Sequence, residues 1–416
     1  MSFPSRRRAR VVGLGVIAAL AASTPSAWAD PAPSYADLLG QIGQAPANLE
    51  GSALLDAAQA RARQAAVLPN PVLGVDVENT QGTGPYSGFD SAETTVSLSQ
   101  PLDLWGRRRA DIGAARSEVD AAGLRRDLAG VDASGRLALA YAEAEAGQRR
   151  MVLAQEGLDL TLADARSAVK LVEEGREPMI RARQGESEAA AARANLEEAR
   201  ANRDAAFARL TAVALLPAPV TSIEASLLDQ APALLGGPMG PPLTVRIAEA
   251  DRVTAERQIG VQQARGRPDL TASIGFRSFE ADGSTALTFG LSTPLPLFDR
   301  NRGNIDAARA DFRAADARLL SARRDADADR AAALARIKAA NTRVWAADEG
   351  VASSEEAYRL ARIGFEEGRI SQLELRSTRT ALLSSREAAI DARLARTRAE
   401  IDLARLEGRA PFQGQN

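Results

Sequence analysis

The chain carries few side chains that could perform catalysis or hold a metal ion. Its 416 residues include no cysteine and no histidine. Thiolate chemistry is thereby excluded, and the commonest general base and transition-metal ligand is missing. The remaining candidates, Asp, Glu, Lys, Ser and Tyr, lie on Ala-rich periodic segments, and their spacing brings no two carboxylates together in a pocket. We therefore expect no catalytic residue, no cofactor and no metal site, and we do not expect an enzyme.

A few charged residues are spaced in a way that suits transport instead. Asp76 and Glu78 alternate with apolar Val75 and Val77. Arg277 stands at a polar position of a similar alternating stretch in the second half. On strands whose apolar positions face lipid, these three side chains would line the lumen of a barrel. Repeated around an oligomer, they would set the field that a permeating ion meets. Simple solvation of a wet interior is the plainer alternative.

The N-terminus indicates the compartment. Four arginines between positions 6 and 10 precede the apolar stretch Val11–Ala22, and Ala27 and Ala29 match a small-x-small cleavage pattern. This predicts a secretory signal peptide over 1–29, since the stretch is too short to cross about 30 Å of hydrocarbon. Its removal changes the formal net charge from −2 to −6 (−2 − 4). An acidic exported chain is a poor binder of nucleic acid, so we expect no nucleic-acid partner.

An internal repeat organises the remaining chain. The stretch that begins at Leu98 aligns without gaps on the stretch that begins at Leu291, at an offset of 193 residues (294 − 101). The same offset recurs far downstream, where Gly175 matches Gly368. One offset at two distant sites indicates a duplication. The aligned stretches define a repeat motif at each expected strand–helix junction: Pro101, Leu104, Trp105, Pro294, Leu297, Phe298 and Arg300.

Each half shows the same order of local patterns. A short helical stretch comes first, over 53–66 and over 243–264, and two runs of period-two alternation follow. Gly/Ser/Asp-rich loops at 81–90 and 281–284 separate the two runs, so each pair predicts a β-hairpin. The apolar positions include Leu73, Val75, Val77, Val96 and Leu98 in the first half and Ala272, Ile274, Phe276, Leu287, Phe289 and Leu291 in the second.

A very long helical stretch is expected after the second strand and its proline in each half. The two stretches run over about 106–172 and 303–365, so each would be about 100 Å long at 1.5 Å per residue, which no compact domain accommodates. Gly175 and Gly368 occupy positions where a left-handed residue would end them. Return helices are expected over 178–214 and 371–406, with Pro178 in the first turn of the earlier one.

These patterns divide the chain into five parts. We expect a signal peptide over 1–29, a first repeat over 30–215, a proline-rich segment over 216–242, a second repeat over 243–408 and a C-terminal tail over 409–416. The segment over 216–242 contains six prolines. Two alternatives stay open for it, a linker or a non-helical belt packed around the helices.

Membrane insertion, if it occurs, requires an oligomer. No run of eighteen apolar residues follows the leader, so a bilayer would have to be crossed by a closed barrel. Four strands cannot close, because about eight is the practical minimum. A soluble hairpin packed on helices, as part of a periplasmic coiled-coil scaffold or adaptor, is the alternative. An exported hydrolase that acts through Asp/Glu pairs is the least supported class.

The leader, the four strands and the two tandem helical hairpins together resemble the TolC-type outer-membrane efflux family. Stretches that begin at Leu68, Gln100 and Pro294 resemble its cobalt–zinc–cadmium branch, and the third, which runs to Ile305, is the most specific. The resemblance implies a mainly α fold with a small β part. Long helical hairpins would form a periplasmic α-barrel, and four strands per chain would join a trimeric outer-membrane β-barrel.

The resemblance also implies partners. The homotrimer would contact outer-membrane lipid, a periplasmic membrane-fusion adaptor and an inner-membrane proton-driven pump of the RND type. It would act as a passive, gated duct for heavy-metal cations or, alternatively, for drugs and other organic compounds. Without cysteine, the chain cannot carry the lipidated N-terminal cysteine of many relatives.

Adaptor docking and gating would fall at the two helical turns. The glycines there would cap helices in either case, and the residues that follow the shared Gly-Arg pair differ between the turns, so we expect two non-equivalent surfaces. The candidate tip residues are Gly175, Arg176, Met179, Gly368, Arg369, Ile370, Ser371 and Leu373.

Overall fold

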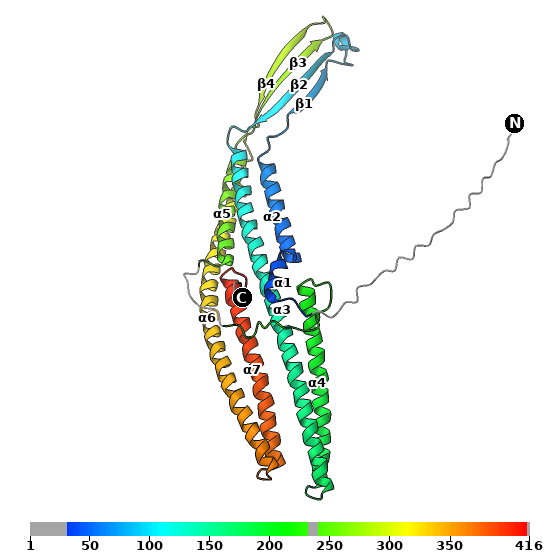
Figure 1. Cartoon of the computed structure of the whole chain (residues 1–416). Helices are drawn as coiled ribbons and strands as arrows, with labels where there is room; N and C mark the ends of the chain where they lie inside the picture. Colours follow the sequence, from blue (N-terminus) through cyan, green and yellow to red (C-terminus); the bar gives the residue numbers. More distant parts are fainter. Residues whose placement is uncertain (1–30, 232–239, 414–416) are drawn as a thin grey trace, which may run out of the picture.

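The computed structural model describes residues 31–231 and 240–413, so the expected signal peptide over 1–29 lies outside the described residues. The described chain is elongated, with a small sheet at one end and two long helical hairpins at the other (Figure 1). In chain order the main elements are α1 (Tyr35–Gln41), α2 (Pro46–Ala65), β1 (Val72–Glu78), β2 (Glu93–Leu102), α3 (Arg107–Glu173), α4 (Met179–Val213), α5 (Leu243–Arg265), β3 (Leu270–Phe279), β4 (Thr285–Ser292), α6 (Arg302–Glu366) and α7 (Gln372–Leu406).

The helices α3 and α6 give the molecule its length. They contain 67 and 65 residues, so each is about 100 Å long at 1.5 Å per residue. Helix α4 returns along α3, α7 returns along α6, and α7 also packs against α3. Small residues let these backbones approach closely: a side chain at Gly147 would meet the backbone of Arg203 at 3.3 Å. The predicted long helical hairpins are confirmed in both halves.

Between the hairpins and the sheet, the short helices α2 and α5 pack along the upper parts of the long ones (Figure 1). Helix α2 lies against α3, whereas α5 lies against both α3 and α6 and so joins the two halves. The four strands form one antiparallel sheet in the order β1-β2-β3-β4. Its central pair, β2 and β3, comes from different halves. Among the described helices, none is long and apolar enough to cross a membrane.

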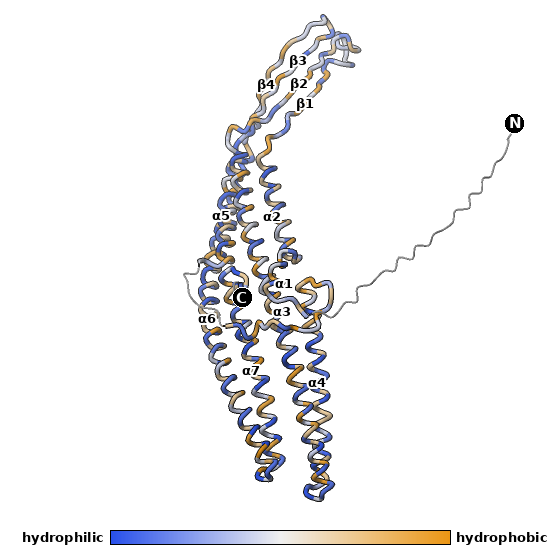
Figure 2. The backbone as a smooth tube through the Cα atoms, in the orientation of Figure 1, coloured by the Kyte–Doolittle hydropathy of each residue, from blue (hydrophilic) through white to orange (hydrophobic). Residues whose placement is uncertain are grey.

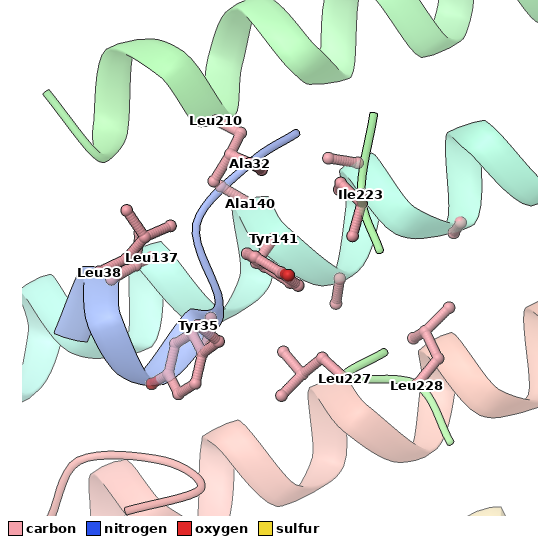
Figure 3. Close-up of a cluster of buried hydrophobic side chains, with 14 of the residues drawn as sticks. Ala32, Tyr35, Leu38, Leu137, Ala140, Tyr141, Leu210, Ile223, Leu227 and Leu228 are labelled. Carbon is pink, nitrogen blue, oxygen red and sulfur yellow. The ribbon is translucent and has the colours of Figure 1, made fainter. Parts of the chain in front are cut away.

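The main apolar core gathers side chains from α1, α3, α4 and the proline-rich segment (Figure 3). Tyr35 of α1 meets the rings of Tyr141 and Phe412 edge-on, with centroids 6.1 Å apart in both pairs. Leu227 and Leu228 of the proline-rich segment are fully buried in the same core. Residues 216–231 of that segment are therefore a belt packed on the helices. We call these residues the belt.

Two local expectations were wrong. Pro101 lies inside β2, opposite Thr271, rather than after the strand, since a proline is tolerated near a strand end. Pro178 is the N-cap of α4, because its extended ψ of 151° places it just outside the helix. Helices α3 and α6 begin within one residue of their expected starts, but these starts do not follow the offset of the repeat. Their left-handed N-cap residues, Gly106 and Asn301, are 195 residues apart (301 − 106) rather than 193.

Candidate functional site: the two-faced sheet and the helical tips

The sheet has one apolar face and one polar face. The register places the apolar positions of all four strands in common rows, for example Leu73, Leu98, Ile274 and Phe289. Along each strand these apolar residues alternate with polar ones (Figure 2). Burial of each such side chain would contribute about 1.5–3 kcal/mol, yet the whole set is exposed: Leu73, Val75, Val77, Val96, Leu98, Ile274, Phe276, Leu287, Phe289 and Leu291. A face of this kind requires an apolar partner.

The polar face carries its charges near the loop end of the sheet. Asp76, Glu78 and Arg277 all lie on this face, as the alternation predicted. The Arg277 guanidinium contacts Glu78 at 3.2 Å and Glu93 at 2.9 Å, and its Nε donates to Thr95 at 3.0 Å. Glu93 was not predicted, although it lies two residues before Thr95 and therefore on the same face of β2. The structure brings Glu78 and Arg277 into contact, whereas Asp76 lies in the same row as Arg277 but forms no ion pair with it.

The first helical tip is closed by a left-handed glycine. Gly175 has φ of +71°, and its N–H donates to Val172 O at 3.0 Å. The next N–H, that of Arg176, donates to Leu171 O at 2.8 Å, which completes a Schellman motif. Met179 begins α4 and is exposed. This tip therefore presents an apolar and a basic side chain to its surroundings.

The second tip has the same closure but a different continuation. Gly368 has φ of +74°, and the N–H of Arg369 donates to Gly364 O at 2.7 Å. Ile370 packs over Gly364, where a side chain would meet it at 3.3 Å. Ser371 forms a capping box with the N3 residue of α7. Ile370 and Ser371 thus hold the turn itself, while Arg369 and Leu373 remain exposed.

A buried charge cluster joins the two hairpins just above the tips. Arg379 of α7 is only 5% exposed and pairs with Asp164 of α3 and, at 3.5 Å, with Glu188 of α4. Arg376 pairs with Glu188 as well. Burial raises the pKa of the Asp164 carboxyl, and the neighbouring Arg379 and Arg376 oppose that shift. Sequence reasoning missed this cluster, because its members come from three helices that the sequence does not bring together.

A second buried carboxylate fixes the belt. Glu145 of α3 accepts from the backbone N–H groups of Leu227 at 2.8 Å and Leu228 at 3.1 Å. It also accepts from Ser226 at 2.7 Å and from Arg149 at 2.6 Å. From the opposite side, Arg396 of α7 donates to the carbonyl of Leu228 at 2.8 Å. The belt is therefore held by charged groups from both halves of the chain.

Six of the seven repeat-motif residues lie between the sheet and the helices. The Trp105 indole N–H donates to the carbonyl of Pro268 at 3.0 Å, which ties the first junction to the start of β3. In the second junction, Arg300 Nε donates to Pro296 O at 3.2 Å, and Phe298 is fully exposed. Leu104 and Leu297 are exposed as well, Pro101 belongs to β2, and Pro294 follows β4. Within the described residues, no group of three or more Asp or Glu side chains could hold a metal ion.

A sheet with an outward apolar face, carried on about 100 Å of helical hairpins, defines the subunit of an outer-membrane channel with a long periplasmic part. The chain belongs to the outer membrane efflux protein family, whose model matches residues 43–214 and 243–409. It is accordingly an efflux channel component of the outer membrane. The family, fold class and location expected from the sequence are confirmed, and the soluble scaffold alternative is set aside.

Two metal-resistance proteins and one solved structure illustrate the relationship. The chain is 36% identical to the nickel-cobalt-cadmium resistance protein NccC of Alcaligenes xylosoxydans xylosoxydans over 324 residues, 77% of this chain and 74% of that protein. It is 32% identical to the cobalt-zinc-cadmium resistance protein CzcC of Cupriavidus metallidurans over 264 residues, 61% and 60% of the two chains. The outer membrane protein VceC of Vibrio cholerae shares the fold, with a TM-score of 0.74, 23% identity, and 91% and 97% of the two chains covered.

Proposed function

We propose that the chain is the outer-membrane duct of an exporter of transition-metal cations and works as a homotrimer. The observation that carries the proposal is the open, two-faced sheet of four strands. Four strands cannot close a barrel, whereas three copies supply twelve (3 × 4). Closure would turn the apolar face toward lipid and the charged face toward the lumen. We assign the duct no catalytic role in this proposal, since the chain has no histidine and no cysteine.

Cobalt and cadmium are the proposed cargo, because both metals appear in the names of the two resistance proteins described above. Energy would come from an inner-membrane proton-driven pump, reached through a periplasmic adaptor. The test is deletion of the gene followed by growth on cobalt, cadmium, nickel, zinc and organic toxicants. Sensitivity to the metals alone supports the proposal. Sensitivity to the organic compounds alone would make the chain a duct for organic compounds.

The lumen charges lead to a prediction about ion selectivity. On the polar face, Asp76, Glu78 and Glu93 outnumber Arg277, which gives a net charge of −2 per chain and −6 per trimer (3 × −2). Arg277→Gln would make it −9 (3 × −3). We expect the cation-to-anion permeability ratio in planar bilayers to rise roughly twofold. Arg359→Gln, the same charge change on exposed α6, is the matched control. A ratio that responds equally to both changes would contradict the lumen position.

The tips lead to a prediction about docking. Leu373 is exposed on the first turn of α7. We expect Leu373→Gln to lower metal resistance while the trimer yield stays unchanged. Leu320→Gln changes a similarly exposed leucine far up α6 and should have little effect. Replacement of Gly368 should act like Leu373→Gln, since its left-handed φ costs another residue about 1–2 kcal/mol. Unchanged resistance in both tip variants would remove the tips from docking.

A further inference from the structure

A groove of about 1230 Å³ lies between α3, α4 and α7. On α3 it is lined by Gly147, Arg150, Ala154 and Gly157, whose spacing of three or four residues places them on one face of the helix. On α4 and α7 it is lined by amide, hydroxyl and charged groups as well as by small apolar side chains. The groove is therefore a polar surface with room for water.

The belt lies on the opposite face of the same helices. On α3, Glu145 binds the belt, whereas Gly147 lines the groove. On α7, Arg396 binds the belt, whereas Arg398 lines the groove. Side chains two positions apart point in directions about 200° apart around a helix. Both helices therefore place the belt on one side of the α3–α7 pair and the groove on the other.

The helices of the two hairpins form a row with two different faces. Helix α3 contacts α4 and α7, and α7 contacts α6, so α4 and α6 lie at the two ends of the row. The belt, α1 and Phe412 thicken one face, since they share an apolar core with α3 and α7. If three such rows close into a ring, the thickened face has room on the outside only. The groove would then turn inward.

The positive charges of the groove are neutralised. Each of the four arginines that line it pairs with a carboxylate: Arg150, Arg376, Arg379 and Arg398. Among the acidic side chains of the groove, Glu198 of α4 and Glu387 of α7 form no ion pair over residues 31–231 and 240–413. These two carboxylates therefore give the groove a negative charge that no arginine offsets.

The two unpaired carboxylates lie at the same height. Arg200, two residues after Glu198, donates to Gln155 of α3 at 3.3 Å. Arg386, next to Glu387, donates to the neighbouring residue of α3 at 2.9 Å. Both carboxylates are therefore level with this point of α3 to within about one helical turn. The point lies 18 residues (173 − 155), or about 27 Å, above the end of α3, well away from the tips.

We propose that the groove forms part of the inner wall of the helical tunnel, and that Glu198 and Glu387 set the preference of this tunnel for cations. The inference rests on the proposed homotrimer, because a single row of helices encloses no tunnel. Three copies place six carboxylates (3 × 2) at one height. Rings of Asp or Glu side chains select cations in ion-conducting pores. Because the arginines of the groove are already paired, a passing cation meets these carboxylates without a competing positive charge.

Introduced cysteines test which face lines the tunnel, because the natural chain has none. Ser384→Cys changes an exposed residue of the groove. Val152→Cys is the control, since Val152 is exposed and lies two turns after Glu145, on the belt side of α3. Current through single channels in planar bilayers is recorded before and after addition of a positively charged methanethiosulfonate reagent. The extent of reaction is measured by mass spectrometry.

The reagent should lower the cation current of the Ser384→Cys channel by roughly a third, because it adds a positive charge to each copy. The Val152→Cys channel should react with the reagent but keep its current. A current that changes in Val152→Cys and not in Ser384→Cys would show that the belt side faces the tunnel, which overturns this inference alone.

Neutral variants test the role of the two carboxylates. We expect Glu387→Gln to lower the cation-to-anion permeability ratio roughly 1.5-fold, and Glu198→Gln with Glu387→Gln to lower it roughly twofold. Glu224→Gln makes the same change of charge at an exposed residue of the belt and should leave the ratio unchanged. An unchanged ratio in the double variant, or an equal fall in Glu224→Gln, would overturn the assignment of selectivity to the groove. A protein that carries no current in any form would overturn the duct and this inference together.

Discussion

Leu98→Arg should prevent the chain from accumulating in the outer membrane, whereas Ser97→Arg should be tolerated. The two residues are neighbours on β2 and lie on opposite faces of the sheet. Leu98 shares its row with Leu73 and Ile274, at the middle of the apolar face. An arginine on the lipid face near the bilayer midplane costs about 2–4 kcal/mol, and every copy in the oligomer carries it. In a water-filled lumen the same side chain stays solvated.

The measurement for this matched pair is the amount of heat-sensitive oligomer in the outer-membrane fraction. The two variants are compared at equal levels of protein synthesis. Both variants introduce the same residue into the same strand, so strand propensity and backbone hydrogen bonds affect them alike. Equal amounts of the two would contradict the assignment of one face to lipid and the other to the lumen.

Glu145→Ala should release the belt from the helices. Glu145 is 4% exposed and accepts from Leu227 and Leu228, whose buried N–H groups would then lack a partner. Removal of one partner from a buried charged network costs about 3–5 kcal/mol. Arg149 would keep its ion pair with Asp229. The lost interactions are therefore those that hold the belt, rather than those on the surface of α3. We expect faster hydrogen exchange at Leu227 and Leu228 and a lower thermal midpoint.

Glu143→Ala is the control for this prediction, since it removes a carboxylate two residues away on α3. Glu143 pairs with Arg398 at 2.9 Å, and that arginine is half exposed. Surface pairs of this kind contribute about 0–1 kcal/mol. If the belt amides show the same hydrogen-exchange rate in the two variants, Glu145 does not hold the belt.

Features with local patterns could be predicted from the sequence. Period-two alternation identified the two faces of the sheet, and Gly175 and Gly368 marked the ends of the long helices within two residues. Both patterns arise from the backbone itself, because strands alternate their side chains and a left-handed position favours glycine. The errors at Pro101 and Pro178 were shifts of one or two residues at the ends of elements.

Features built from distant contacts could not be predicted. The Arg379 cluster depends on α7 packing against α3, and the belt depends on Glu145, which is just one of many glutamates on Ala-rich helices. In the sequence, a buried carboxylate and a solvated one are the same residue type. Only tertiary packing makes them different. The docking roles of the tip residues and the lumen roles of Asp76, Glu78 and Arg277 remain proposals that the variants above test.

The ionic conductance of the purified oligomer in a planar lipid bilayer tests the central claim most directly. We predict discrete current steps from a unit of three chains, with a preference for cations set by the net negative charge of the polar face. A protein that extracts as a monomer and carries no current across the bilayer would contradict the account.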